Sequence, residues 1–360
     1  MRIPTSLAAL ALVLTAALVA PQVGADSPTT DAPAVAQGRQ AAAPAAPAVD
    51  LASRTPSADA ATTQVLAISI DGLTPRAIRR LGATGAPALT RLLAEGASTV
   101  RARTQWESTS TLPNHTSMVT GRRVWDWKGG HGVLWNEHRP GTRVQQFADD
   151  LPIPSVFTGA SAAGSTALFT TKEKFSLFKR SWRADLDRYV HRETDDVALT
   201  TQVVADLART PRAFRFVHLS RPDSRGHTYG FMSPEYLDGV RESDAQVGRM
   251  LTAIEATPAL ADTVVVLTAD HGGGRGQTLH DQVGRRPNFE IPFVVWGPGV
   301  RAGDLYAMNP TYRSPGTRRV GYAGRQPIRN GDLANLSLDL LGLGPLPGSR
   351  YDVRQRLTWE

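Results

Sequence analysis

An α/β fold with a doubly wound, mainly parallel central sheet and helices on both faces is predicted by three observations. Four apolar runs of six to eight residues have the length and composition of buried strands. Amphipathic segments lie between these runs, and this alternation is typical of a parallel sheet whose crossovers are helices. A content of 32 Gly and 25 Pro in 360 residues favours a loop-rich catalytic fold over a coiled coil or a helical array.

The four apolar runs are expected to form the centre of the sheet. The first, residues 64–70 (QVLAISI), ends at Asp71-Gly72, which is typical of a buried strand that ends in a turn. The other three are residues 213–220 (AFRFVHLS), 263–268 (TVVVLT) and 291–296 (IPFVVW).

Three helices are expected from capping residues and hydrophobic periodicity. Residues 75–81 follow Thr74 as a cap and begin with Pro75, and residues 87–95 also begin with Pro. Residues 234–257 place six apolar side chains on one helical face: Leu237, Val240, Val247, Met250, Leu251 and Ile254. Residues 126–192 are the least regular, and we expect a small irregular excursion near the active site there.

The N-terminal part of the chain is expected to lie outside the fold. Residues 1–25 combine a basic start, an apolar stretch and a small-x-small end, the signature of a secretory signal peptide cleaved near Ala25. Residues 26–62 are rich in Ala and Pro and read as a disordered linker, which leaves residues 63–360 as the catalytic domain. No later segment is apolar enough to span a membrane. We therefore expect a secreted protein, periplasmic or extracellular.

Composition excludes several classes of protein. The chain has no Cys, so a disulfide framework, a thiolate zinc finger and a cysteine nucleophile are excluded. The net charge of +7 is carried by 36 Arg and only four Lys, which is compatible with attraction to phosphates. No basic run is long enough to indicate a nucleic-acid groove, so no nucleic-acid polymer is expected as a partner.

Carboxylates and histidines gather at the ends of the expected strands. Three aspartates and three histidines lie there or just beyond: Asp71, Asp223, His227, Asp270, His271 and His280. The carboxyl ends of parallel strands form the ligand-binding edge of such sheets, and these side chains are suitable ligands for Zn²⁺ or a similar ion. Taken singly, each fits a turn, a hydrogen-bonded histidine or a helix cap equally well. Their joint position favours a metal site.

Candidate reacting groups lie in a segment dense in hydroxyls, residues 107–116. A hydroxyl there becomes a nucleophile at neutral pH if a metal lowers its pKa. The purely structural alternative is a Ser/Thr turn that caps a helix starting near His115. The nearby Trp106, Trp125, Trp127 and Trp135 either stack on a ligand or pack in the core. A further segment, residues 170–175 (TTKEKF), either supplies a cation to a phosphate or is a solvated loop.

The order of these motifs resembles the alkaline phosphatase superfamily, and more narrowly its type I phosphodiesterase/nucleotide pyrophosphatase branch. The motifs are Ser-Ile-Asp71-Gly, Thr111-Leu-Pro-Asn-His115, Pro-Asp223-x-x-Gly-His227 and Ala-Asp270-His271-Gly. The resemblance covers most of residues 65–348. It implies a sheet that carries two divalent metal ions, expected to be Zn²⁺.

The resemblance also implies roles for individual residues. One ion would be held by Asp71, Asp270 and His271 together with the nucleophile Thr111. The other would be held by Asp223, His227 and His280, with His115 or His131 as alternatives to His280, because the family's third histidine lies further along the chain. Asn136, in a segment that resembles the family's His-Gly-x-x-x-Asn, would donate to a phosphoryl oxygen.

The function that the resemblance implies is hydrolysis of a small-molecule phosphate ester by a secreted metal-dependent enzyme. A phosphodiesterase or nucleotide pyrophosphatase is the first expectation, and a phosphomonoesterase of the same superfamily is the alternative. A monoesterase would be expected to carry an additional cation for the doubly charged phosphate. A third interpretation is an exported binding protein without turnover, which a missing ligand or nucleophile would favour.

Overall fold

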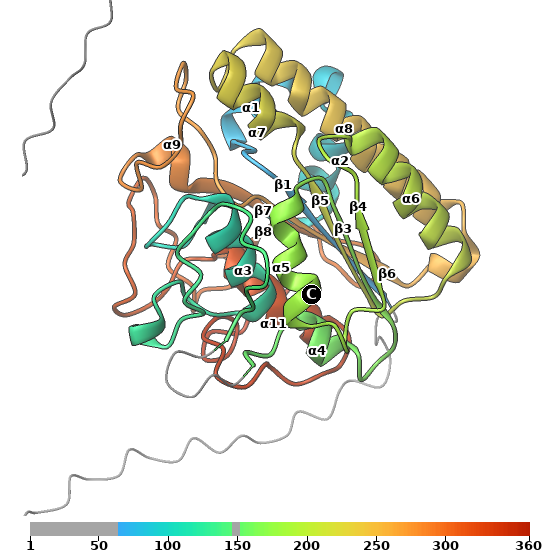
Figure 1. Ribbon diagram of the computed structural model, residues 1–360. Helices are drawn as coiled ribbons and strands as arrows, with labels where there is room; N and C mark the ends of the chain where they lie inside the picture. The colour runs from blue at the N-terminus through green and yellow to red at the C-terminus, as the bar shows by residue number, and fades with distance from the viewer. Residues whose placement is uncertain (1–63, 146–151) are drawn as a thin grey trace, which may run out of the picture. The chain divides into compact units, whose positions relative to one another are not determined.

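The computed structural model describes residues 64–145 and 152–360, which form an α/β domain (Figure 1). The expected signal peptide and linker lie outside these ranges. No helix in the described ranges has the length and hydropathy needed to cross a bilayer.

Eight strands form one mixed sheet in the order β4-β3-β5-β1-β6-β7-β2-β8. Pairing is parallel throughout, except that β7 runs antiparallel to both of its neighbours. The strands are β1 (Gln64–Ile70), β2 (Ala97–Arg103), β3 (Thr166–Thr170), β4 (Arg188–His191), β5 (Phe214–Leu219), β6 (Thr263–Thr268), β7 (Glu290–Trp296) and β8 (Gly303–Asp304). Every residue of β1, β3, β5 and β6 is buried, because helices cover both faces of the sheet.

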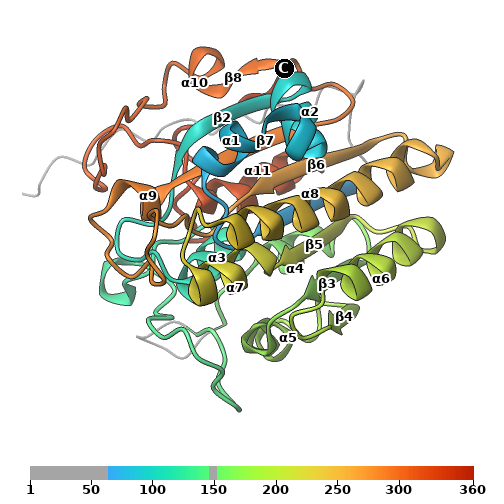
Figure 2. The same ribbon diagram turned by 90° about the horizontal axis from the view of Figure 1, so that it is seen from above.

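The helices form two layers on opposite faces of the sheet, as Figures 1 and 2 show. One layer contains α1 (Pro75–Gly85), α2 (Pro87–Glu95), α6 (Asp196–Arg209), α7 (Arg221–Tyr229) and α8 (Pro234–Glu255). The opposite layer contains α3 (Thr111–Thr120), α4 (Val156–Ala160) and α11 (Leu333–Leu340). Three short helices complete the set: α5 (Ser176–Ser181), α9 (Arg286–Phe289) and α10 (Leu305–Met308).

The predicted α/β class with a mainly parallel sheet is confirmed, and two of the four expected strands have the predicted bounds. One of the four runs departs from the parallel pattern: β7, the third strand from one edge of the sheet, is antiparallel to both of its neighbours. β7 begins only about 20 residues after β6 ends, and no helix packs across the sheet between them, so the chain returns in the opposite direction.

A buried ion cluster fastens α6 to β5 at the amino-terminal end of the sheet. Asp206 accepts hydrogen bonds from Arg212 Nε at 2.8 Å and from Arg215 Nε at 2.9 Å, and all three side chains are almost fully buried. Burial alone would raise the pKa of Asp206, but the two guanidinium groups hold it below its usual range. The cluster therefore stabilises the fold only while Asp206 is ionised.

Replacing Asp206 with Asn should lower the free energy of unfolding by about 3–5 kcal/mol, because two buried guanidinium groups lose their counter-ion. The native pKa is depressed, so this stabilisation is present above the unfolded value near ~3.9 and disappears as the pH falls through the native pKa. Denaturant unfolding at several pH values measures the effect. Asp238→Asn, which removes an exposed pair with Arg241, should change stability by less than about 0.5 kcal/mol. Equal effects of the two substitutions would contradict this interpretation.

Candidate two-metal active site

Four adjacent parallel strands bring charged side chains together at their carboxyl-terminal ends. Asp71 directly follows β1, Asp270 lies two residues beyond β6, and Asp223 lies in the first turn of α7 after β5. Lys172 follows β3. Because β3, β5, β1 and β6 are neighbours and run parallel, their carboxyl ends meet, and residues distant in sequence become adjacent.

Six of the predicted site residues form two clusters whose ligand atoms lie within 4.8 Å of one another in each. In the Asp71 cluster (Asp71, Asp270 and His271), His271 Nε2 lies 3.2 Å from Asp71 Oδ1 and 3.3 Å from Asp270 Oδ2. The second cluster consists of Asp223, His227 and His280. We call it the Asp223 cluster. His271 Nε2 is also 3.8 Å from Asp223 Oδ1, so the two clusters are neighbours.

The turn after β1 holds the Asp71 cluster in shape. Gly72 has a φ of 71°, a conformation that favours glycine, and a Cβ there would lie 3.0 Å from the Asp223 Cα. The Gly72 amide donates to Asp270 Oδ1 at 3.1 Å, and the His271 amide donates to the same oxygen at 2.9 Å. The other oxygen of Asp270 is thereby directed into the cluster.

The donor atoms of these clusters fit divalent metal ions. Four of the twelve buried side-chain atoms that have no hydrogen-bond partner within the described residues belong to these clusters: Asp71 Oδ1, Asp223 Oδ1, Asp270 Oδ2 and His271 Nε2. Buried polar atoms without partners are costly and rare in folded proteins. All four atoms face the interior of the clusters, where a cation would satisfy them. Carboxylate oxygen and imidazole nitrogen are also the donor set that Zn²⁺ accepts.

The three histidines are oriented as metal ligands usually are. Each Nδ1 contacts a backbone carbonyl: His271 that of Gly272 at 2.9 Å, His227 that of Thr278 at 2.7 Å, and His280 that of Thr109 at 2.7 Å. A carbonyl only accepts, so Nδ1 carries a proton and Nε2 is the free ligand atom. The Nε2 atoms of His227 and His280 lie 3.2 Å apart, which is favourable when a cation lies between them.

The charges of the clusters are compatible with bound cations. Burial raises the pKa of Asp270 well above its usual value, and repulsion from Asp71 adds to the rise. Burial would also lower the pKa of His271, yet Asp270 and Asp71 raise it to about 9. Burial would raise the pKa of Asp71, but Lys172, His218 and His271 hold it well below its usual range. Two divalent ions would supply the charge that these carboxylates require.

Thr111 is the first residue of α3, is buried, and lines a cavity of about 360 Å³ beside the Asp223 cluster. Asn136 and two lysines, Lys172 and Lys174, line the same cavity. The dipole of α3 favours bound anions at its N-terminus. A Ser/Thr turn that merely caps a helix near His115 is therefore not observed: the helix begins at Thr111 itself.

Asn136 is positioned by its amide oxygen. Its Oδ1 accepts from the Leu112 amide at 2.9 Å and from Lys174 Nζ at 3.2 Å. With the oxygen engaged on both sides, the amide nitrogen is the atom left to donate. This orientation is compatible with the predicted role of Asn136 as a donor to a phosphoryl oxygen.

His115 and His131, the alternatives to His280, are hydrogen-bonded to other groups, although His115 Nδ1 also lies 3.6 Å from Asp270 Oδ2. His115 contacts Ser69 Oγ at 2.8 Å and the Thr111 carbonyl at 2.8 Å. His131 contacts Ser117 Oγ at 2.9 Å and accepts from the Val133 amide. Both side chains are buried with both ring nitrogens engaged, so the structure brings His280, and neither of the two alternatives, into a cluster.

Two contacts at the site were not predicted from sequence, although one of them is made by Lys172, which belongs to the candidate segment 170–175. His218 lies on β5, and its Nε2 is 3.1 Å from Asp71 Oδ2, so it orients that carboxylate. Its only sequence signal is a histidine inside an otherwise apolar strand. Lys172 Nζ lies 2.6 Å from both Asp71 Oδ2 and Asp223 Oδ2, and thus connects the two clusters.

The four tryptophans lie apart from the cavity. Trp106 and Trp125 meet edge to face with ring centroids 5.7 Å apart, and Trp125 stacks on Trp127 at 5.2 Å. Trp135 packs against the core and under Arg139. None of them is among the described residues that line the cavity; Trp106, Trp125 and Trp127 contact one another, and Trp135 packs against the core.

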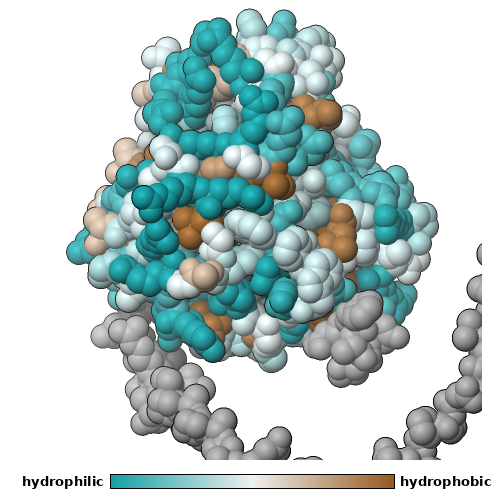
Figure 3. Space-filling view, turned by 90° about the vertical axis from the view of Figure 1, so that its left-hand side faces the viewer, coloured by the Kyte–Doolittle hydropathy of each residue, from teal (hydrophilic) through white to brown (hydrophobic). Residues whose placement is uncertain are grey.

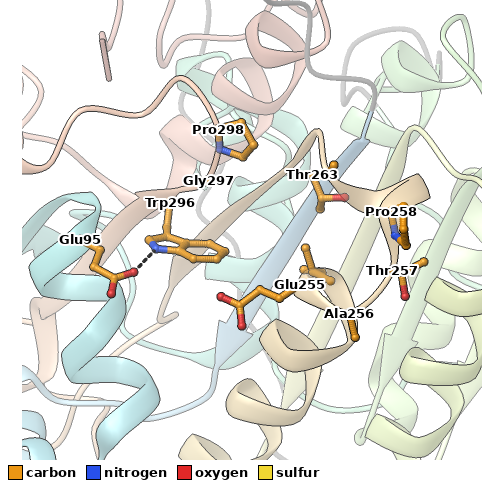
Figure 4. Close-up of a pocket in the computed structure, with 11 residues that line it drawn as sticks. Glu95, Glu255, Ala256, Thr257, Pro258, Thr263, Trp296, Gly297 and Pro298 are labelled. Carbon is orange, nitrogen blue, oxygen red and sulfur yellow. Dashed lines mark hydrogen bonds between the residues drawn. The ribbon is translucent and has the colours of Figure 1, made fainter.

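A larger cavity of about 410 Å³ lies at the opposite edge of the sheet (Figure 4). It is bounded by Trp296 at the end of β7 and Thr263 at the start of β6, and Glu95 Oε2 accepts from Trp296 Nε1 at 3.0 Å. Its carboxylates, Glu95 and Glu255, are both paired with Arg91. On the face that Figure 3 shows, hydrophobic residues are scattered rather than gathered in one patch. The unpaired carboxylates and histidines therefore lie at the carboxyl-terminal ends of the parallel strands, and not in the larger cavity.

Replacing His280 with Ala should weaken the binding of one of two metal equivalents by at least about 100-fold. Loss of a residue that is only hydrogen-bonded to a metal ligand already lowers metal affinity about 10–100-fold, and His280 is itself a proposed ligand. Calorimetric titration of the metal-free protein with Zn²⁺ measures this change. His138→Ala is the matched control, since His138 lies at the cavity rim and pairs with Glu173 instead of a cluster. Unchanged binding in His280→Ala would remove His280 from the ligand set.

The fold and the paired clusters at its carboxyl edge define an alkaline phosphatase-like protein. The model of the type I phosphodiesterase/nucleotide pyrophosphatase family matches residues 65–311. The chain therefore belongs to that family, within the alkaline phosphatase superfamily.

Curated relatives include GPI ethanolamine phosphate transferase 1 of Saccharomyces cerevisiae, 24% identical over 69% of this chain. The protein of the same name from Candida glabrata is 27% identical over 53% of this chain. This chain spans 28% and 22% of their lengths, about a quarter.

Solved structures share the fold at low identity. Murine ectonucleotide pyrophosphatase/phosphodiesterase 5 has a TM-score of 0.57 and 14% identity, with 82% of this chain and 100% of that chain covered. A 2-O GAG sulfatase has a TM-score of 0.59 and 15% identity, with coverage of 82% and 75%.

Proposed function

We propose that this protein is a secreted metal-dependent hydrolase of phosphate esters that uses Thr111 as its nucleophile. The observation that carries the proposal is the position of Thr111 at the N-terminus of α3, in the same cavity as Asp223 and His227. The murine neighbour supports it, because the inactive form of that protein, solved with AMP, carries a threonine-to-alanine substitution.

In this proposal, Asp71, Asp270 and His271 hold one divalent ion, and the Asp223 cluster holds the other. Bound ions would supply Lewis acidity, which lowers the pKa of the Thr111 hydroxyl and of a water and stabilises the leaving oxygen. Thr111 Oγ attacks phosphorus, the P–O bond to the leaving alcohol breaks, and a phosphothreonine forms. The oxygen of a water then attacks phosphorus as the Thr111 Oγ–P bond breaks, and Thr111 Oγ regains a proton. The product is phosphate from a monoester substrate and the remaining monoester from a diester substrate. Asn136 and the N-terminus of α3 stabilise charge on the phosphoryl oxygens.

The family favours a diester or a nucleotide pyrophosphate as the substrate, and a monoester is the second candidate. The names of the curated relatives add a third, transfer of the phosphoryl group to an alcohol in place of water. Side-by-side hydrolysis of bis(p-nitrophenyl) phosphate and p-nitrophenyl phosphate by the Zn²⁺-loaded protein tests the proposal. We expect turnover of at least one ester, abolished by a chelator and restored by Zn²⁺. No turnover of either by a chain with two bound ions would contradict it.

A further inference from the structure

The cavity shown in Figure 4 lies at the start of β6, and the proposed hydrolysis does not use it. Its volume of about 410 Å³ is in the range of sites that bind small molecules. Most of its walls are apolar or aromatic, with Pro258 on one side and Trp296 on the other. Among the described residues that line it, the charged ones are Glu95 and Glu255, both acidic. The cavity therefore combines apolar walls with negative charge.

Two helices end at this cavity, and each of them ends in a glutamate. Glu95 is the last residue of α2, and Glu255 is the last residue of α8. A helix C-terminus carries partial negative charge, so a cation is favourable there and a carboxylate is not. The last turn of neither helix contains a basic residue. The charges of the two glutamates therefore add to the partial charges of the two helix ends, and the cavity attracts cations.

Arg91 compensates only part of this negative charge. Its guanidinium lies 3.0 Å from Glu95 Oε2 and 2.5 Å from Glu255 Oε1, so one cation serves two carboxylates. Both oxygens of Glu95 accept from Arg91 Nε, and Oε2 also accepts from Trp296 Nε1. Glu255 Oε1 accepts from Arg91, whereas no donor among the described residues is hydrogen-bonded to Glu255 Oε2. Glu255 is therefore the carboxylate that is left to pair with a ligand.

Trp296 and Thr263 supply two further features that suit a cation with hydrogen-bond donors. The indole of Trp296 lies between Glu95 and Glu255 in Figure 4, and an aromatic ring attracts a cation while it offers apolar area. Thr263 is only 1% exposed, and its hydroxyl has no hydrogen-bond partner within the described residues. A buried hydroxyl without a partner is costly, so an N–H group from the cavity would stabilise it.

We propose that this cavity binds a small organic cation that carries an ammonium group on an apolar body. Glu255 is its counter-ion, the ring of Trp296 contacts the apolar body, and Thr263 Oγ accepts a hydrogen bond from the ligand. A neutral ligand of the same shape leaves the charge of Glu255 unpaired, and an anion is repelled by both glutamates and both helix ends. This binding site lies apart from the candidate metal clusters and does not depend on the proposed function.

The charge preference is measured with three probes that share one apolar ring. The Zn²⁺-loaded protein is titrated at neutral pH by calorimetry with cyclohexylammonium, cyclohexanol and cyclohexanecarboxylate. We expect one equivalent of cyclohexylammonium to bind about tenfold or more tightly than cyclohexanol, the usual effect of a charged hydrogen bond. The carboxylate should bind more weakly than the alcohol. No binding of cyclohexylammonium, or equal binding of the ammonium and the alcohol, would overturn the inference.

Two substitutions locate the binding in this cavity. Glu255→Gln should weaken cyclohexylammonium binding by about tenfold or more and change cyclohexanol binding by less than about threefold. Glu235→Gln, in the first turn of the same helix, is the matched control and should change neither.

Thr263→Val should also weaken ammonium binding, yet it should not lower the melting temperature of the free protein, because it removes a hydroxyl that has no partner. Ammonium binding that is equal in Glu255→Gln and Glu235→Gln would place the site elsewhere and overturn the inference. Hydrolysis of phosphate esters should be the same in Glu255→Gln as in the wild type, so the two proposals are tested separately.

Discussion

Thr111→Ala should reduce turnover of the phosphate ester by at least about 10³-fold, because the substitution removes the only protein atom proposed to form a bond to phosphorus. Thr111 Oγ lies outside the buried hydrogen-bond networks that hold α3, so the variant should fold and bind metal as the wild type does. Steady-state kinetics with a matched metal content measures the loss.

Two further variants serve as controls for the Thr111→Ala prediction. Thr111→Ser keeps a hydroxyl at the same position and should retain part of the activity. Ser110→Ala changes the preceding hydroxyl, which caps no amide of α3, and should leave the rate within a few-fold of the wild type. If Ser110→Ala were the slow variant and Thr111→Ala the active one, the nucleophile would be misassigned.

Asp71→Asn should cost a further large factor, about 10³-fold in turnover, together with one equivalent of bound metal. Asp71 Oδ1 lies beside His271, and Asp71 Oδ2 contacts His218 and Lys172. Asp71 therefore connects a ligand of its own cluster to two residues outside that cluster. Loss of its charge removes several kcal/mol of metal-based charge stabilisation, and every ~1.36 kcal/mol is tenfold in rate.

Metal analysis and kinetics on the same sample test the prediction for Asp71. Asp281→Asn is the control, because Asp281 is adjacent to His280 in sequence but exposed and outside both clusters. A two-metal Asp71→Asn protein with wild-type turnover would exclude Asp71 as a ligand.

The strands that sequence predicted best are those buried on both faces. β1 and β6 are continuous apolar runs, and such runs carry a clear signal in the sequence. β2 was not predicted, because its sequence ASTVRAR alternates with charged residues. Its Arg103 is buried only because carbonyls of Arg101, Ala102, Gly316 and Arg318 accept from its guanidinium. That arrangement depends on a loop more than 200 residues away, which no local pattern reveals.

The site residues were predictable by type and position, but their contacts were not. Aspartate and histidine at strand ends indicated metal ligands, and the structure brings all six together in two clusters. The contact of Lys172 with Asp71 and Asp223 requires β3 to lie beside β5, and β3 itself was not predicted. Segment 170–175 was left open between a phosphate-binding cation and a solvated loop, and the contacts of Lys172 with Asp71 and Asp223 exclude a solvated position for this residue.

The stereochemical course at phosphorus tests the central claim most directly. The ester that the wild type hydrolyses is prepared with an isotopically chiral phosphoryl group, and the configuration of the product is determined by ³¹P NMR, with an alcohol as acceptor if the substrate is a monoester. Attack by Thr111 followed by attack of the acceptor makes two in-line displacements, so the account predicts net retention of configuration. Inversion would mean a single direct displacement at phosphorus and would contradict Thr111 as the nucleophile.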